Sequence, residues 1–212
     1  MNLGLFIIPI RYKNIDSYPF DYLDFCVDAE KSGFSEVYIG EHITDAREDI
    51  RSSMIFASAL ASRTKKIKIC LSVLPLPHYN VDLLFSQLKD LYLLTEGRLK
   101  VGIGPGALNS DLNYMKIDVQ KRYIKFEKNL EMFLNKFEHD SDLSNLRHNL
   151  FSTILSPYPV NSRKLNDMGI GIFSSNFSSR NNLNAHITCY SSNKNLDEYL
   201  SRWSIGHNFI SK

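Results

Sequence analysis

A strand-and-helix unit of about 32 residues repeats through the first two thirds of the chain. Apolar segments begin near residues 3, 36, 67 and 99, so successive starts are 33, 31 and 32 positions apart. A helical spacing of apolar residues follows each of the first three segments. A crossover between parallel strands needs roughly 30 residues. The repeat therefore predicts parallel strands joined by helices in an α/β domain.

The same patterns locate the individual elements. Asn80 stands where it can cap the third helix, and Gly33 follows the first helix at a position that favours glycine. Residues 138–149 are polar and predict an irregular segment. Strands are expected over residues 3–8, 36–40, 66–73, 98–103, 151–155, 170–173 and 203–210, and helices over 20–32, 52–63, 81–91 and 119–137.

Two architectures suit such a repeat, a closed barrel and an open, doubly wound sheet. The open sheet calls for a GxGxxG turn after the first strand, whereas Gly4 stands alone there. The spacing therefore favours a TIM-like (β/α) barrel. Seven strands are expected where a closed barrel has eight, so the barrel is predicted to be incomplete. One domain is expected over residues 1–212, with regular units over 1–137, a short insertion over 138–150 and a reduced part over 151–212.

Composition excludes several classes of function. A formal charge of +2, with no basic cluster beside aromatic residues, argues against nucleic-acid binding. No apolar run is long enough for a membrane span, and the apolar start lacks the basic region of a signal peptide. The three cysteines, Cys26, Cys70 and Cys189, have no CxxC spacing and predict core residues in a reducing compartment. A cytoplasmic protein without a metal site is expected.

Candidate site residues lie where predicted strands end, at the edge that forms the active site of a parallel barrel. His42 follows Gly40 and Glu41, and an imidazole beside a carboxylate is a tunable acid–base group. A capping or surface histidine remains the alternative. The glycines between Gly102 and Gly106 either allow a tight turn or let the backbone approach a flat ligand.

The remaining histidines are weaker candidates. His78 follows two prolines, Pro75 and Pro77, and is expected to be a loop residue, with a place in a substrate pocket as the alternative. His139 and His148 lie in the polar segment and are expected to be solvated. No pair of histidines has the spacing of metal ligands.

Four stretches resemble the bacterial luciferase-like family of flavin-dependent monooxygenases. They are Leu3–Phe6, Ala29–His42, Val73–His78 and Gly97–Asp111. The last, with its Gly-Pro-Gly-Ala-Leu and Ser-Asp, is similar to the limonene and alkanal monooxygenase branch. The resemblance is strong over residues 1–137 and weaker beyond.

The resemblance implies a TIM-like barrel that binds FMN, with reduced flavin supplied by a partner reductase. Reduced flavin and O₂ would then oxidise a small apolar substrate. His42 matches the catalytic histidine of the family. Leu71 and Ser72 match a segment along the flavin that often contains a non-prolyl cis peptide, and Gly104, Pro105 and Gly106 match the turn under the isoalloxazine ring. Ser156 matches a serine near the phosphate or the ring edge, and Ser174 and Ser175 match a strand end beside the phosphate.

The chain also departs from the family. Pro105 stands where luciferases carry an arginine that contacts the phosphate, and the eighth strand is absent. A similar reduction in the non-fluorescent flavoprotein of luminous bacteria leaves flavin binding without turnover. The alternatives are therefore a catalytically reduced flavin-binding protein and a non-catalytic subunit. The resemblance further implies a homodimer, or a heterodimer with a homologous chain, formed by helices that carry Met54, Ile55, Leu60 and Leu84–Leu91.

Overall fold

The structure is a computed structural model that describes residues 4–7, 20–46, 48–154 and 168–174. Its strands are β1 (Gly4–Ile7), β2 (Glu36–Ile39), β3 (Lys68–Pro75), β4 (Leu99–Gly104), β5 (Leu150–Ile154) and β6 (Gly171–Ser174). Its α-helices are α1 (Phe20–Lys31), α2 (Ser53–Arg63), α3 (Val81–Leu94), α4 (Asn109–Tyr114), α5 (Arg122–Glu138) and α6 (Ser144–His148). Short 3₁₀ turns are η1 (Leu76–His78), η2 (Val119–Lys121) and η3 (Ser141–Leu143).

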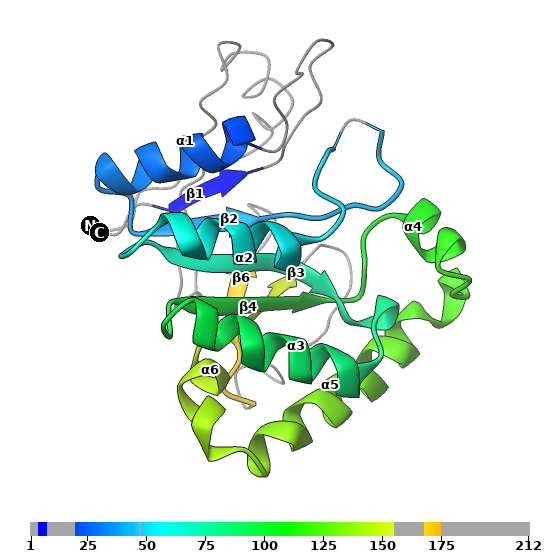
Figure 1. Cartoon of the computed structure of the whole chain (residues 1–212). Coiled ribbons are helices and arrows are strands. Elements are labelled where there is room, and N and C mark those ends of the chain that lie inside the picture. Colours follow the sequence, from blue (N-terminus) through cyan, green and yellow to red (C-terminus); the bar gives the residue numbers. More distant parts are fainter. Residues whose placement is uncertain (1–3, 8–19, 47, 155–167, 175–212) are drawn as a thin grey trace.

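The six strands form one sheet in the order β1-β2-β3-β4-β5-β6, and every neighbouring pair is parallel. Parallel strands in chain order are the arrangement of a barrel wall, and the open-sheet alternative would require a reversal of strand order. The predicted α/β class with parallel strands is thus confirmed. In Figure 1 the arrowheads of β2, β3 and β4 point toward the loop after β2 and toward α4. The expected strand over residues 203–210 lies outside the described residues.

One face of the sheet carries the main core. Leu5, Val37, Ile69 and Val101 are cross-strand neighbours or near neighbours that point to this face and are almost fully buried. Apolar side chains of α1, α2, α3 and α5 cover them, as the helices in Figure 1 suggest by their placement along the sheet. Burial of each large aliphatic side chain contributes roughly 1.5–3 kcal/mol. This layer holds the strand ends in fixed positions.

The opposite face has a smaller cluster in which no helix of the described chain takes part. Tyr38, Cys70 and Phe151 are its buried members, and the rings of Tyr38 and Phe151 meet edge to face with centroids 6.0 Å apart. Toward the amino ends of the strands, Lys100 Nζ lies 3.3 Å from a Glu36 carboxylate oxygen. This face is therefore filled by side chains at its middle and has an ion pair at its amino end.

Local signals explain where the helices begin and end. Asn80 Oδ1 accepts a hydrogen bond from Leu83 N at 3.0 Å, so the predicted cap of α3 is confirmed. Gly33 follows α1 with φ of 91°, a conformation that favours glycine. The segment 138–149, expected to be irregular, instead forms η3 and α6, because buried Leu143 and Leu146 anchor it to the core. Helix α4 was also not predicted, since six residues are too few for a visible period.

The cysteines and the helices can be compared with what the composition predicts. Cys26 and Cys70 are buried free thiols, as predicted, and burial raises the pKa of both. Cys189 lies outside the described residues. Among the helices that the structure describes, none combines the length and the apolar character needed to cross a membrane.

Candidate functional site

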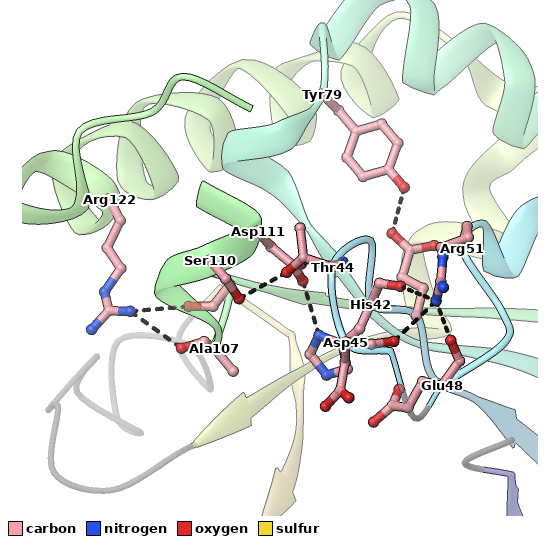
Figure 2. Close-up of polar contacts among 12 residues, drawn as sticks. His42, Thr44, Asp45, Glu48, Arg51, Tyr79, Ala107, Ser110, Asp111 and Arg122 are labelled. Carbon is pink, nitrogen blue, oxygen red and sulfur yellow. Dashed lines mark hydrogen bonds and ion pairs between the residues drawn. The ribbon is translucent and has the colours of Figure 1, made fainter. Parts of the chain in front are cut away.

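His42 and Asp111 meet at the carboxyl edge of the sheet. His42 follows β2, whereas Asp111 lies on α4, after β4, and 69 positions later in the chain. His42 Nδ1 lies 3.0 Å from Asp111 Oδ2, and the Asp111 side chain is only 4% exposed against 27% for His42 (Figure 2). A buried carboxylate therefore holds an imidazole that still reaches the surface.

Thr44 completes the environment of the Asp111 carboxylate. Its backbone N donates to Asp111 Oδ1 at 2.8 Å, and its hydroxyl lies 2.6 Å from the same oxygen. Burial raises the pKa of Asp111, but hydrogen bonds from Thr44 and His42 outweigh that effect, so the pKa lies below its ordinary value. An ionised carboxylate only accepts hydrogen bonds. His42 must then carry its proton on Nδ1, which leaves Nε2 as a proton acceptor when the ring is neutral.

The loop that carries His42 has a second support. Arg51 Nη1 donates to the carbonyl oxygens of His42 at 3.3 Å and Asp45 at 3.2 Å, and also contacts that of Glu48 (Figure 2). The His42 backbone N donates to the Ile50 carbonyl oxygen. One guanidinium therefore ties several loop carbonyls together.

The carboxylate partner of His42 differs from the one that the sequence suggests. Glu41 was the expected neighbour, but its carboxylate faces Ser53 and Tyr79 instead. The alternation of side chains along an extended segment explains the difference, because consecutive residues point to opposite sides. Asp111 appeared in the quoted Ser-Asp motif without a role. Its position shortly after the end of a predicted strand is the sequence signal that could have identified it as a site residue.

Ser72 lies inside β3 and carries a buried hydroxyl without a hydrogen-bond partner. The peptide bond between Ser72 and Val73 is cis and does not involve proline, as the resemblance implied for this segment. The pairing of β3 with β4 shifts between Leu71 and Leu74. The Leu71 side chain is fully buried in the helix-covered core, so only its backbone is available to a ligand. A buried hydroxyl without a partner is costly unless a ligand or water completes it.

Gly104, Pro105 and Gly106 form the turn between β4 and α4. Gly104 pairs with Pro75 on β3, and Gly106 has φ of 87°, which only glycine adopts without strain. A Cβ on Gly106 would lie 3.5 Å from His78 Nε2, so His78 packs directly against this turn. The turn thus lies beside the β3–α3 loop.

His78 is more buried than a solvated loop residue. Its Nε2 is buried without a hydrogen-bond partner, and burial lowers the pKa of the ring, an effect that nearby Asp111 opposes. The structure therefore brings His78 close to the His42–Asp111 pair and favours its neutral form. Its role in a substrate pocket stays a hypothesis.

Arg122, at the start of α5, reaches the same turn from the other side. Its Nη1 lies 3.4 Å from the carbonyl oxygen of Gly106 and 3.2 Å from Asn109 Oδ1, and the guanidinium stacks on Tyr123 at 5.0 Å. Its Nε is buried without a partner. No carboxylate of the described chain pairs with it. Sequence reasoning missed Arg122, because nothing in the helical pattern around it marks a site.

Of the three serines expected at the phosphate or the ring edge, the structure describes only Ser174. Ser174 ends β6 and pairs with Ile154 of β5, which puts its backbone at the same carboxyl edge. Ser156 and Ser175 lie outside the described residues. Within the described ranges, no group of three or more His, Cys, Asp or Glu side chains is arranged to hold a metal ion.

Comparisons with known proteins identify the family of this chain. Residues 5–161 match the family described as luciferase-like monooxygenase. Limonene 1,2-monooxygenase of Rhodococcus erythropolis is 37% identical over 89 residues, which are 42% of this chain and 23% of that protein. An F420-dependent glucose-6-phosphate dehydrogenase of Amycolatopsis mediterranei is 32% identical over 96 residues, 43% of this chain and 29% of that protein.

Solved structures give the same fold. The oxygenating constituent of 3,6-diketocamphane monooxygenase of Pseudomonas putida, a type II Baeyer–Villiger monooxygenase in complex with FMN, superposes with a TM-score of 0.72. It is 20% identical, and the match covers 82% of this chain and 57% of that one. RslO1 of Streptomyces bottropensis, a monooxygenase, gives a TM-score of 0.71 at 19% identity, over 81% of this chain and 59% of that chain.

The matches fall short of the full length of these proteins. The aligned part of this chain spans about a quarter of the curated relatives and somewhat over half of the solved chains. The family match nonetheless covers residues 5–161 out of 212 and includes β1 to β4 with the His42–Asp111 pair. By that match, and by a fold in which parallel strands present His42 at their carboxyl edge, this chain belongs to the luciferase-like monooxygenase family.

Proposed function

We propose that this chain binds FMN at the carboxyl edge of its sheet. We further propose that it acts as a flavin-dependent monooxygenase on a small apolar substrate, with O₂ and reduced flavin from a separate reductase. The observation that carries the proposal is the contact between half-buried His42 and buried, ionised Asp111. Polar groups at this edge are where parallel α/β sheets bind ligands and carry out chemistry.

The residues around the pair fit a flavin. The Ser72 hydroxyl is buried without a partner and is available to a polar atom of the ring. Gly104 and Gly106 bring a backbone without side chains to the same edge. Arg122 offers a guanidinium without a carboxylate partner in the described chain, which suits the phosphate. It would supply a positive charge that Pro105 does not.

When bound, reduced FMN supplies the electrons with which O₂ is activated. His42 has a separate task. Asp111 keeps the proton of the ring on Nδ1, so Nε2 accepts a proton in the neutral ring and donates one in the charged ring. Thr44 keeps the carboxylate oriented through two contacts. Ser174 and Ser175 are proposed to contact the phosphate, Ser156 to contact the phosphate or the ring edge, and Leu71 to contribute its backbone.

Two alternatives remain as competing proposals. Some relatives are named F420-dependent, among them the Amycolatopsis protein and a secondary alcohol dehydrogenase with an F420–acetone adduct, whose TM-score is 0.56 at 22% identity. A deazaflavin is thus the second cofactor candidate. The other alternative is a protein, or a subunit, that holds flavin without turnover.

One experiment separates these proposals. Purified protein is titrated with FMN and, in parallel, with F420, while cofactor fluorescence is followed. We expect FMN fluorescence to be quenched at protein concentrations of roughly tens of micromolar or below. Quenching of F420 alone would support the deazaflavin alternative. Binding of FMN without substrate oxidation, when a reductase, NADH and O₂ are present with limonene or camphor as probes, would support the binding protein.

Association is a further part of the proposal. We propose a homodimer formed by α2 and α3, which pack against each other and carry exposed Ile55 and Leu83 in their first turns. The residues expected at this interface need correction. Leu60, Leu84, Leu88 and Leu91 are buried in the core of the chain and are not available to a partner. A heterodimer with a homologous chain is the alternative.

We also propose a single domain over residues 1–212 and a cytoplasmic location. Buried free thiols at Cys26 and Cys70 suit a reducing compartment. Detection of the protein in the cytoplasmic fraction of cells tests the location.

A further inference from the structure

Glu41 forms a buried network of its own behind the site. Only 9% of the residue is exposed. Its Oε2 accepts hydrogen bonds from the backbone N of Ser53 at 2.8 Å and from the Ser53 hydroxyl at 2.7 Å, and its Oε1 accepts one from the Tyr79 hydroxyl at 2.6 Å. One carboxylate thus joins the end of β2, the first turn of α2 and the β3–α3 loop.

The members of this network are neighbours in sequence of two histidines of the site, His42 and His78. Glu41 directly precedes His42, and Tyr79 directly follows His78. The hydrogen bond between Glu41 and Tyr79 therefore connects the two segments that carry these imidazoles. The dashed line at the Tyr79 hydroxyl in Figure 2 marks this hydrogen bond.

The β3–α3 loop is also held by hydrogen bonds that do not involve Glu41. Asn129, buried on α5, donates from Nδ2 to the carbonyl oxygens of Leu76 at 2.9 Å and Tyr79 at 3.5 Å. The loop is therefore held by α5 on one side and by Glu41 on the other. Removal of the Tyr79 hydroxyl leaves the Asn129 contacts in place, so the loop stays folded.

We propose that Glu41, through its hydrogen bond with Tyr79, is a positioning residue that holds His42 in register with Asp111. His42 lies between two anchors: Glu41 on one side, and Thr44, bound to Asp111, on the other. With Glu41 released, the segment keeps its contacts with Thr44, Arg51 and Ile50 but loses its anchor at the end of β2, so the ring turns more freely. The relevance of this for catalysis rests on the proposed function, but the geometry exists without flavin.

The test compares Tyr79→Phe and Glu41→Gln with the wild type. Tyr92→Phe is the matched control, because Tyr92 is a partly buried tyrosine in the last turn of α3, outside the site. The first measurement uses protein without flavin. Nitrogen-15 NMR of the imidazoles reports which nitrogen of His42 carries the proton, and the downfield Nδ1 proton reports its hydrogen bond to Asp111.

We expect Tyr79→Phe and Glu41→Gln to broaden or remove the downfield proton signal and to mix the two ring tautomers. The control should keep the wild-type spectrum. If all variants keep the wild-type tautomer while Tyr79→Phe and Glu41→Gln lower the melting temperature, the network is only structural and the proposal is wrong. Should Glu41→Gln fail to fold, Tyr79→Phe alone decides between these outcomes.

The second measurement is FMN affinity. We expect about a fivefold or larger increase in Kd for Tyr79→Phe and no change for Tyr92→Phe, because loss of one hydrogen bond to Glu41 loosens the segment that carries His42. Failure of the wild type to bind FMN contradicts the proposed function but leaves the NMR result to decide the positioning role. Unchanged affinity together with an unchanged spectrum overturns it.

Discussion

The Nδ1 atom of His42 lies 3.0 Å from Oδ2 of Asp111, across 69 positions of sequence. Asp111 is the buried partner, and hydrogen bonds from Thr44 help to hold it ionised. The pair therefore joins the ends of two barrel strands through one contact. It also sets the direction in which His42 exchanges protons, because the nitrogen that faces Asp111 is already occupied.

Asp111→Asn should reduce turnover with reduced flavin by about tenfold or more, since an amide holds the imidazole less firmly than a carboxylate does. Steady-state rates with a reductase check this. Asp142→Asn is the control, because Asp142 is an exposed carboxylate near the start of α6. Equal rates for Asp111→Asn and the wild type would mean that the contact does not serve the reaction.

Asp111 should also make stability depend on pH. Because its pKa is lowered in the folded chain, its stabilising contribution is present above the ordinary value of about 3.9 and is lost as pH falls through the folded value. The difference in free energy of unfolding between wild type and Asp111→Asn should be present at about pH 5. It should shrink below about pH 4 in urea denaturation, and a difference that grows there would contradict the assignment.

Ser72→Ala tests whether the buried hydroxyl awaits a ligand. Without flavin, the variant should be at least as stable as the wild type, since it removes a buried polar group without a partner. Its Kd for FMN should rise about fivefold. Ser58→Ala, which removes a hydroxyl bonded within α2, is the control and should bind FMN normally. Thermal melts and fluorescence titration give both values.

Gly102→Ala should destabilise the chain by about 1–3 kcal/mol or more. A Cβ there would lie 2.5 Å from a ring carbon of Phe151 and 2.7 Å from the Leu71 carbonyl oxygen, and backbone cannot move aside easily. Gly40→Ala is the comparison, because its Cβ would meet neighbours only at 3.7 Å and beyond. Chemical denaturation should show a loss for the first variant and little change for the second.

Ile55→Asp and Leu83→Asp should convert the proposed dimer to monomers. Both side chains are largely exposed in the chain, at 75% and 58%, so the substitutions leave the core intact. Ile124→Asp, at an equally exposed site on α5, should keep the dimer. Light scattering at micromolar concentration measures the mass. A wild type that scatters as one chain of this length would contradict the dimer.

The fold could be predicted from the sequence because each strand–helix unit has its own spacing of apolar residues and its own capping residues. The helical spacing from Val81 to Leu91 and the cap at Asn80 predicted α3 directly. The site was harder to predict. Glu41 precedes His42 and was therefore the expected partner, whereas the real partner, Asp111, lies there because β2 and β4 end at the same edge of the sheet. Arg122 and the Glu41–Tyr79 contact likewise depend on packing between distant segments, which no local period records.

Hydrogen–deuterium exchange with and without FMN tests the central claim most directly, because it shows where the ligand lies. The account predicts slower exchange in residues 40–44, 71–73 and 104–111, at the carboxyl edge of the sheet, when FMN is added. Residues 65–67 and 97–98, at the amino edge, should exchange as before. Protection confined to the amino edge, or no protection at saturating FMN, would contradict it.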